Sequence, residues 1–187
     1  WGGRQDISFD YECRLYVLDS LMGAGKTHPV REYVWQRPEL SVLSITFRHA
    51  ARYLSEQLSL KCYLDGDFWQ PENDRSRCVI CLDSLYKLIL KVDEPYDLVI
   101  IDECVFVMYH FLGGTMSVNL PRIVDAFRFF LSSAGKVVVI QHRILESCIA
   151  FYMKSMALRR GPMPHCVVRY PSGPVVLHPM KVLTKES

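Results

Sequence analysis

Short apolar runs alternate with segments of helical periodicity along most of the chain. The apolar runs predict strands at Leu15–Asp19, Ser41–Phe47, Cys78–Leu82, Asp97–Asp102 and Val137–Ile140. The periodic segments predict helices at Lys26–Gln36, His49–Leu60, Ser84–Leu90, Ile123–Leu131 and Ile144–Leu158. Strands that alternate with helices indicate βαβ units and a mostly parallel sheet that is covered on both faces. We therefore expect an α/β fold in three layers.

Two segments interrupt this alternation. Asp65–Arg77 is the most polar and least periodic part of the chain and is expected to be an exposed loop. Arg159–Pro164 is typical of a connector, and beyond it Cys166–Arg169 and Val175–Leu177 are expected to be two strands around a proline- and glycine-containing turn. We therefore expect one lobe over residues 1–158 and a separate tail over residues 159–187.

The most informative segment follows the first predicted strand. Leu15–Asp19 runs into the turn Ser20-Leu-Met22-Gly23-Ala24-Gly25-Lys26-Thr27, and a predicted helix follows. Glycines allow a tight backbone whose N–H groups point at phosphate oxygens, and the helix presents its positive N-terminal end to the same anion. This order predicts a phosphate-binding loop of the Walker type, with serine at the place of the usual first glycine.

In such a loop the Lys26 ammonium group reaches the β- and γ-phosphates of a nucleotide, and the Thr27 hydroxyl binds Mg²⁺. The remaining candidate cofactor-binding residues are Ser20, Met22, Gly23, Ala24 and Gly25. The alternative is a chance glycine-rich turn. A match to all fixed positions has odds on the order of one in a thousand in a chain of this length, so we favour a true phosphate loop.

Two adjacent carboxylates end another apolar run, Leu98-Val-Ile-Ile, and they are Asp102 and Glu103. Asp102 is a candidate Mg²⁺ ligand, directly or through water. Glu103 is a candidate for orienting or deprotonating an attacking water. The alternative is a buried strand that ends in solvated acids. Downstream of a phosphate loop, the pair is better explained as a hydrolytic site, because a simple kinase does not need the second carboxylate.

Composition narrows the class of protein. The chain has 187 residues, 50% of them hydrophobic, and a formal net charge of only +2. These values exclude a disordered polyelectrolyte and a globally basic nucleic-acid binder, so any nucleic-acid contact must come from a local patch. No apolar run reaches the length of a membrane span, and we expect no membrane partner.

The cysteines point to a reducing compartment. There are seven, at positions 13, 62, 78, 81, 104, 148 and 166. An odd number scattered through apolar segments argues against a secreted disulfide framework, and Cys78-x-x-Cys81 has no second pair at zinc-ligand spacing. We expect core thiols, with a metal or redox site as the alternative.

Four segments, in order and spacing, resemble the helicase family of the herpesvirus origin-binding proteins and their cellular relatives, within superfamily 2. They are Ser20–Thr27, Ser44-Ile-Thr46-Phe47-Arg48, Cys81-Leu-Asp83-Ser84-Leu-Tyr-Lys87, and Ile101–Val105 continuing to Gly114-Thr-Met116. The first segment and the Asp-Glu pair are generic to the superfamily, and the others are more specific. The resemblance spans roughly residues 13 to 142. It implies a P-loop NTPase fold, the first RecA-like lobe of a helicase.

The resemblance also implies a function. The chain would be the ATP-binding lobe of an ATP-dependent DNA helicase with a role in replication, and a second lobe would be needed for translocation or unwinding. ATP and Mg²⁺ are the implied cofactors, single-stranded or origin DNA the implied partner, and the nucleus, otherwise the cytoplasm, the implied location. The implied contacts with the nucleic-acid backbone come from Thr46, Phe47, Arg48, Asp83 and Ser84. By residue type alone, Phe47 is better explained as a core aromatic and Arg48 as a solvated helix start.

Two parts of the family pattern differ here. After the fifth predicted strand the family carries an acidic residue or serine followed by alanine, which couples the nucleotide site to the strand. This chain has Gln141, His142 and Arg143 instead. His142 is a candidate substitute, although a lone histidine near a strand end is more often structural. The second lobe, with its arginine fingers, and the origin-binding domain are expected to lie outside this chain, and residues 159–187 to lead toward that lobe.

Two other functions remain as alternatives. A degenerate lobe could hold nucleotide or nucleic acid without turnover. A small-molecule kinase would need a lid over its substrate, and the polar loop Asp65–Arg77 is the one candidate for it. Without a partner lobe, we expect the chain to bind nucleotide but to hydrolyse little of it, because an arginine finger is worth about 10³- to 10⁵-fold in rate in GTPases.

Overall fold

A computed structural model of the protein describes residues 8–9, 12–19, 28–68, 77–90, 92, 94–113, 119–157, 166–170 and 180–183. Its strands are β1 (Leu15–Asp19), β2 (Val42–Thr46), β3 (Lys61–Cys62), β4 (Arg77–Cys81), β5 (Leu98–Asp102), β6 (Lys136–Gln141), β7 (Cys166–Tyr170) and β8 (Met180–Leu183). They form one sheet in the order β3-β4-β2-β5-β6-β1-β7-β8. Neighbours pair in parallel except β7 and β8, which are antiparallel.

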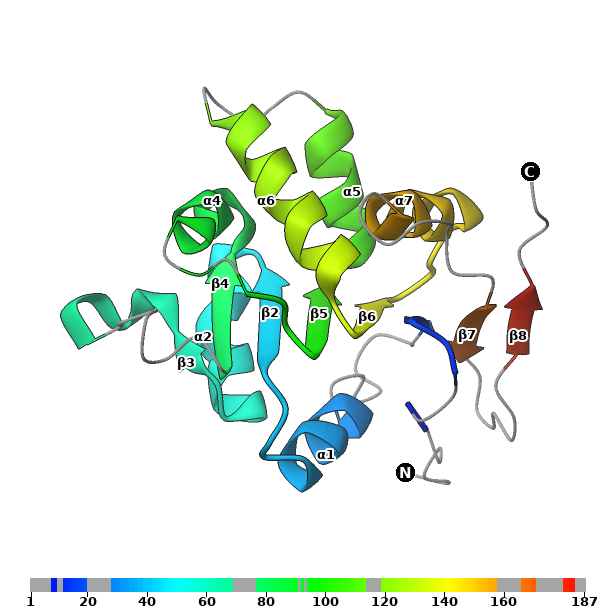
Figure 1. The fold of residues 1–187 in the computed structure, drawn as a ribbon, viewed down its shortest axis with the longest axis horizontal. Helices are drawn as coiled ribbons and strands as arrows, with labels where there is room; N and C mark the ends of the chain where they lie inside the picture. Colours follow the sequence, from blue (N-terminus) through cyan, green and yellow to red (C-terminus); the bar gives the residue numbers. More distant parts are fainter. Residues whose placement is uncertain are drawn as a thin grey trace.

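Helices cover both faces of this sheet (Figure 1). They are α1 (His28–Gln36), α2 (Arg48–Leu58), α4 (Leu85–Ile89), α5 (Cys104–Leu112), α6 (Leu120–Ser133) and α7 (Glu146–Ala157), with 3-10 turns at Tyr63–Phe68 and Leu82–Ser84. Buried residues of α1 and α2 pack against one face, and those of α4 to α7 pack against the other. The predicted three-layer α/β/α fold with a mostly parallel sheet is therefore confirmed.

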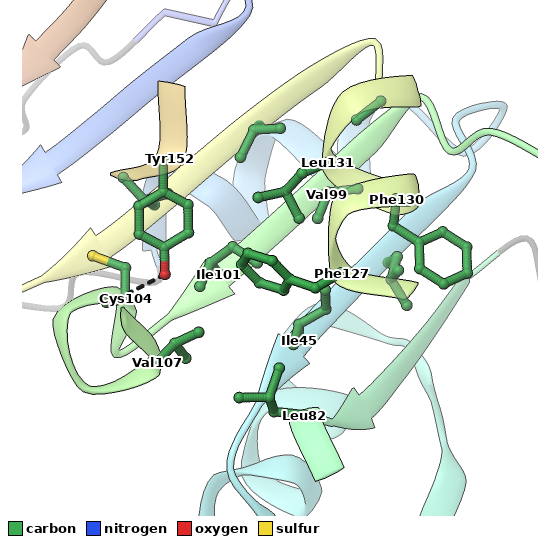
Figure 2. Close-up of a cluster of buried hydrophobic side chains, with 14 of the residues drawn as sticks. Ile45, Leu82, Val99, Ile101, Cys104, Val107, Phe127, Phe130, Leu131 and Tyr152 are labelled. Carbon is green, nitrogen blue, oxygen red and sulfur yellow. Dashed lines mark hydrogen bonds between the residues drawn. The ribbon is translucent and has the colours of Figure 1, made fainter. Parts of the chain in front are cut away.

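The strands supply both halves of the core because their side chains alternate between the faces. In β1, Leu15 and Val17 belong to the cluster under α4 to α7, whereas Tyr16 and Leu18 belong to the cluster under α1 and α2. Strands buried on both faces read as continuous apolar runs, which is why the central strands were recognisable from sequence. Figure 2 shows the first cluster, where the Phe127 ring of α6 lies beside Ile101 of β5 and Ile45 of β2.

Most predicted elements occur within a few residues of their expected bounds. Pro121 lies in the first turn of α6, as expected of a proline at a helix start. The segment Asp65–Arg77 differs in part, since its first residues continue a 3-10 turn. Its last residue, Arg77, begins β4 and donates hydrogen bonds to the carbonyls of Val34 and Arg37.

The tail extends the same sheet. β7 pairs in parallel with β1, on the side opposite β6, and β8 pairs with β7. β7 and β8 therefore belong to the same sheet as the predicted lobe and are not separated from it at residue 158, because β7 pairs with β1. The strand expected at Val175–Leu177 and the connector Arg159–Pro164 lie outside the described residues.

The cysteines with described side chains are mostly core thiols. Cys62, Cys78, Cys81, Cys104 and Cys148 are free and buried, as the sequence indicated. Cys13 differs, because it is disulfide-bonded. Among the helices that the structure describes, none combines the length and apolar character needed to cross a bilayer.

Candidate functional site

The candidate residues that the structure describes lie at or after the carboxyl ends of neighbouring strands. β4, β2, β5, β6 and β1 are parallel neighbours, so their carboxyl ends lie at the same edge, where ligands bind in open α/β sheets. The register aligns Asp102 of β5 with Ile140 of β6, and Ile140 with Leu18 of β1. The end of β5 and the end of β1, which precedes the phosphate-loop sequence, therefore lie at the same level with β6 between them.

The phosphate loop itself lies outside the described residues. This applies to all of its candidates, Ser20, Met22, Gly23, Ala24, Gly25, Lys26 and Thr27. The flanking elements have the predicted order, since β1 ends at Asp19 and α1 begins at His28. The Asp19 carboxylate accepts a hydrogen bond of 3.1 Å from the Ile144 N–H, which links the end of β1 to the loop after β6.

Asp102 and Glu103 differ in environment although they are adjacent. Asp102 ends β5 and is only 6% exposed. Glu103 is the residue before α5 and has a left-handed backbone, with φ 55° and ψ 46°. Its Oε2 atom is buried and makes no hydrogen bond within the described part of the chain. Asp102 is thus the nearly buried acid at the end of β5, and Glu103 lies at the turn into α5.

The donor chemistry fits a magnesium–nucleotide complex. Mg²⁺ prefers oxygen ligands, and in phosphate-transfer sites it is held by one or two carboxylates together with phosphates and waters. Asp102 supplies such a carboxylate at the edge where β1 leads into residue 20. Clusters of three or more potential metal-ligating side chains are absent from the described ranges, and a site of this kind does not need one.

Gln141 caps the helix that follows the Asp-Glu pair. Its side-chain Oε1 accepts hydrogen bonds from the N–H groups of Val105 (2.7 Å) and Phe106 (3.4 Å). These are the N–H groups that an N-cap side chain normally satisfies, but Glu103 at the N-cap makes no such bond. Gln141, which stands in the place of the missing family motif, therefore connects β6 to α5.

Replacing Gln141 by methionine should destabilise the fold by about 1–2 kcal/mol. Methionine keeps the volume but removes the acceptor, which leaves the buried Val105 N–H and the partly buried Phe106 N–H without this partner. Urea unfolding followed by circular dichroism measures the change, with Arg128→Ala on the exposed side of α6 as the control. Equal stability of Gln141→Met and the wild type would show that this cap contributes nothing.

Further contacts fix the start of α5. The Tyr152 hydroxyl of α7 donates a hydrogen bond of 2.7 Å to the Cys104 carbonyl, drawn as a dashed line in Figure 2. The Cys104 and Cys148 sulfurs lie 4.0 Å apart. Burial raises the pKa of the Cys104 thiol, and the hydrogen bond with Cys148 raises it further. The thiol beside the Asp-Glu pair is therefore protonated and packs as part of the core.

A hollow of about 610 Å³ lies near Glu103 of the Asp-Glu pair. It is lined by Phe47, Arg48, His49, Leu64, Cys81 and Asp83. Three of them follow β2, Cys81 and Asp83 lie at the end of the neighbouring strand β4, and Leu64 lies in the 3-10 turn after β3. Three of the five candidates for nucleic-acid contact, Phe47, Arg48 and Asp83, are thus brought together, as their positions at two strand ends suggested.

The five candidates differ in what they can contact. Arg48 is exposed and forms no ion pair with any described residue, so its guanidinium is available to a phosphate. Phe47 is half-buried and packs against the core. Thr46 is fully buried, so its hydroxyl does not reach the surface in this conformation. Ser84 is half-buried and makes no side-chain cap bond to α4.

Asp83 contacts a histidine that sequence analysis did not identify as a site residue. His110 Nε2 of α5 lies 3.3 Å from Asp83 Oδ1, and the His110 ring meets the Phe47 ring edge-on at 5.7 Å. On α2, Arg52 pairs with Asp65, and the hydrogen bond from Arg52 lowers the pKa of the Asp65 carboxyl. Arg52 therefore already has a carboxylate partner, whereas Arg48, at the start of the same helix, has no ion-pair partner among the described residues.

His49 joins the two parts of the site. Its Nε2 lies 3.3 Å from Glu103 Oε2, and its ring stacks on Phe47 with 6.1 Å between centroids. Sequence analysis missed this histidine, because it occupies an ordinary position in the first turn of a helix. The available signal was its place directly after the strand-end segment Thr46–Arg48.

Comparisons with known proteins bear on the fold. No protein-family model matches the chain, and no curated protein matches it. Solved structures do match. The SWI2/SNF2 ATPase core of Sulfolobus solfataricus, in complex with dsDNA, superposes with a TM-score of 0.53 and 14% identity over 78% of this chain and 31% of that one. Mss116p, bound to ssRNA and AMP-PNP, superposes with a TM-score of 0.57 and 9% identity over 86% of this chain and 37% of that one.

The chain thus spans about a third of the length of the structures it matches. At these identities the likeness concerns the fold alone. The described strands and helices have the fold of a RecA-like lobe, with a mostly parallel sheet between helices.

Proposed function

We propose that the chain is the ATP-binding lobe of a superfamily 2 helicase that acts on DNA and is related to replication origin-binding proteins. The observation that carries the proposal is the position of Asp102 and Glu103 at the carboxyl end of β5, level with the strand that leads into the phosphate-loop sequence. The similar cores were solved with dsDNA or with ssRNA and AMP-PNP, which supports a nucleotide and a nucleic acid as ligands.

The proposed roles follow from the sequence motifs and, for Asp102 and Glu103, from their positions at the end of β5. Lys26 and the backbone of residues 20–27 bind the phosphates, and Thr27 and Asp102 hold Mg²⁺. The bound metal neutralises charge on the phosphates. Glu103 positions the attacking water and accepts its proton. Gln141 keeps the start of α5, and with it Glu103, in place relative to β6.

The hollow is the proposed nucleic-acid surface. Arg48 would pair with a backbone phosphate, and the helix start at Arg48 offers N–H groups to a neighbouring one. Contacts of this kind position the strand without reading its sequence, so the surface is suited to single-stranded DNA of any sequence. Origin recognition and nuclear replication are inferred from the sequence resemblance.

Nucleotide binding by this chain tests the proposal. Lys26→Ala should weaken the binding of a fluorescent ATP analogue at least tenfold, since the ammonium group makes charge-assisted bonds to the phosphates. Lys154→Ala, which removes an exposed lysine from α7, is the matched control and should bind as the wild type does. Titration by fluorescence anisotropy with Mg²⁺ present measures all three affinities.

The same titration can overturn the proposal. Equal affinities of the wild type and Lys26→Ala would mean that residues 20–27 do not bind phosphates. Retained circular dichroism spectra of both variants would show that the comparison is between folded proteins.

A further inference from the structure

His49 lies at the boundary between the proposed hydrolytic pair and the proposed nucleic-acid surface. Its Nε2 is 3.3 Å from Glu103 Oε2, and the same side chain lines the hollow beside Arg48. β2, which precedes His49, and β5, which precedes Glu103, are adjacent strands. One imidazole therefore contacts both parts of the site.

The contact between His49 and Glu103 is weak enough to be exchanged. The His49 side chain is 70% exposed, and Glu103 Oε2 makes no hydrogen bond with a described residue, so the pair is a close polar contact without hydrogen-bond geometry. The imidazole is the exposed partner, so water solvates it when the contact breaks, and contacts of exposed charged groups contribute little to stability. A phosphate that arrives beside His49 can therefore compete with the Glu103 carboxylate for the imidazole.

The surrounding charges favour such competition. Arg48, the neighbour of His49, has no ion-pair partner among the described residues. Asp83, which also lines the hollow, lies 3.3 Å from His110 Nε2 through its Oδ1 atom. A phosphate in the hollow therefore meets Arg48 and His49 as the two groups that can bind it.

We propose that His49 is a positioning residue that makes Glu103 respond to nucleic acid. In the free protein His49 holds the Glu103 carboxylate. A nucleic-acid phosphate bound beside Arg48 takes over the imidazole, and the carboxylate is released to act on the attacking water. The proposal rests on the function proposed above and adds to it the residue through which the hollow acts on Glu103.

This mechanism makes two contacts mutually exclusive, which binding measurements detect without any turnover. Removing the Glu103 carboxylate should tighten the binding of nucleic acid, because His49 no longer has to leave a partner. Loss of a negative charge alone would also tighten binding, but that effect does not need His49. A double-mutant cycle between the two positions separates the explanations.

The experiment measures the affinity of a fluorescein-labelled oligothymidylate for this chain by anisotropy. Four proteins form the cycle, namely the wild type, Glu103→Gln, His49→Ala and the double variant. We expect Glu103→Gln to tighten binding about two- to fivefold more in the presence of His49 than in its absence, which is the range for an exposed pair. Glu56→Gln removes an exposed carboxylate from the same helix as His49 and should show no dependence on His49.

A conservative variant distinguishes a positioning role from a structural one. His49→Gln keeps a polar Nε2 at similar reach, and it should restore the dependence on Glu103 that His49→Ala abolishes. Additive effects in the cycle, or equal behaviour of His49→Gln and His49→Ala, would overturn the proposal and leave the proposed function intact. Failure of the wild type to bind the oligonucleotide at all would overturn the nucleic-acid part of the proposed function as well.

Discussion

Glu103→Gln should abolish ATP turnover while leaving nucleotide binding close to that of the wild type. A general base contributes about 10²- to 10⁴-fold to a rate, and glutamine keeps the shape of the side chain but cannot accept the proton. Binding is retained because phosphate and metal contacts come from other residues. Phosphate release in the presence of single-stranded DNA, in a form of the protein that includes a second lobe, measures the loss.

The control for this prediction is a carboxylate near the same edge that has no proposed role. Glu146 begins α7 after β6 and is exposed, and Glu146→Gln should turn over ATP like the wild type. Turnover by Glu103→Gln equal to that of the wild type would contradict a hydrolytic role. A wild-type protein that binds nucleotide but shows no turnover with DNA would favour the degenerate binding module instead.

Phe130→Ala should destabilise the fold by about 3–5 kcal/mol, the range for truncating a large buried aromatic side chain. Phe130 of α6 is fully buried, and its ring meets the Tyr96 ring edge-on at 5.7 Å. The loss combines the transfer of apolar surface to water with a cavity that the neighbouring strands can fill only partly. Urea unfolding monitored by circular dichroism gives the change in free energy.

If Phe130→Ala fails to fold, a milder variant still allows the free energy of unfolding to be measured. Phe130→Leu fills part of the cavity and should lose about 1–2 kcal/mol, within the usual range for a core substitution. The neighbouring exposed residue provides the control, since Arg128→Ala should change stability by less than about 0.5 kcal/mol. A loss below about 1 kcal/mol in Phe130→Ala would show that α6 is loosely packed.

The sheet was predictable because its central strands are buried on both faces. β1, β2, β4, β5 and β6 each appear as mostly apolar runs, and all were expected near their observed bounds. The tail was harder, because a strand that pairs with β1 from the end of the chain leaves no local signal of its partner.

Helix α5 was missed, because it lacks a polar face. Phe106, Tyr109 and Leu112 are exposed although they are apolar, so Cys104–Leu112 has no amphipathic period. The very short β3 was missed for lack of length.

The parts of the site that depend on motifs were predictable, and those that depend on neighbouring strands were not. Asp102 and Glu103 follow an apolar run, and their placement at the strand end follows from the sequence alone. The contact of Gln141 with α5 requires that β5 and β6 be adjacent, and the contact of His49 with Glu103 requires the same of β2 and β5. Neither adjacency is encoded in a local pattern.

The left-handed backbone at Glu103 lowers the stability of the fold, while the proposed reaction requires a carboxylate at this position. A residue with a Cβ atom loses about 1–2 kcal/mol in this conformation relative to its preferred ones, whereas glycine does not. Genetic drift under selection for folding alone would therefore replace the acid by glycine or asparagine. A glutamate retained here across descendants of this sequence would record selection on the reaction that the carboxylate performs.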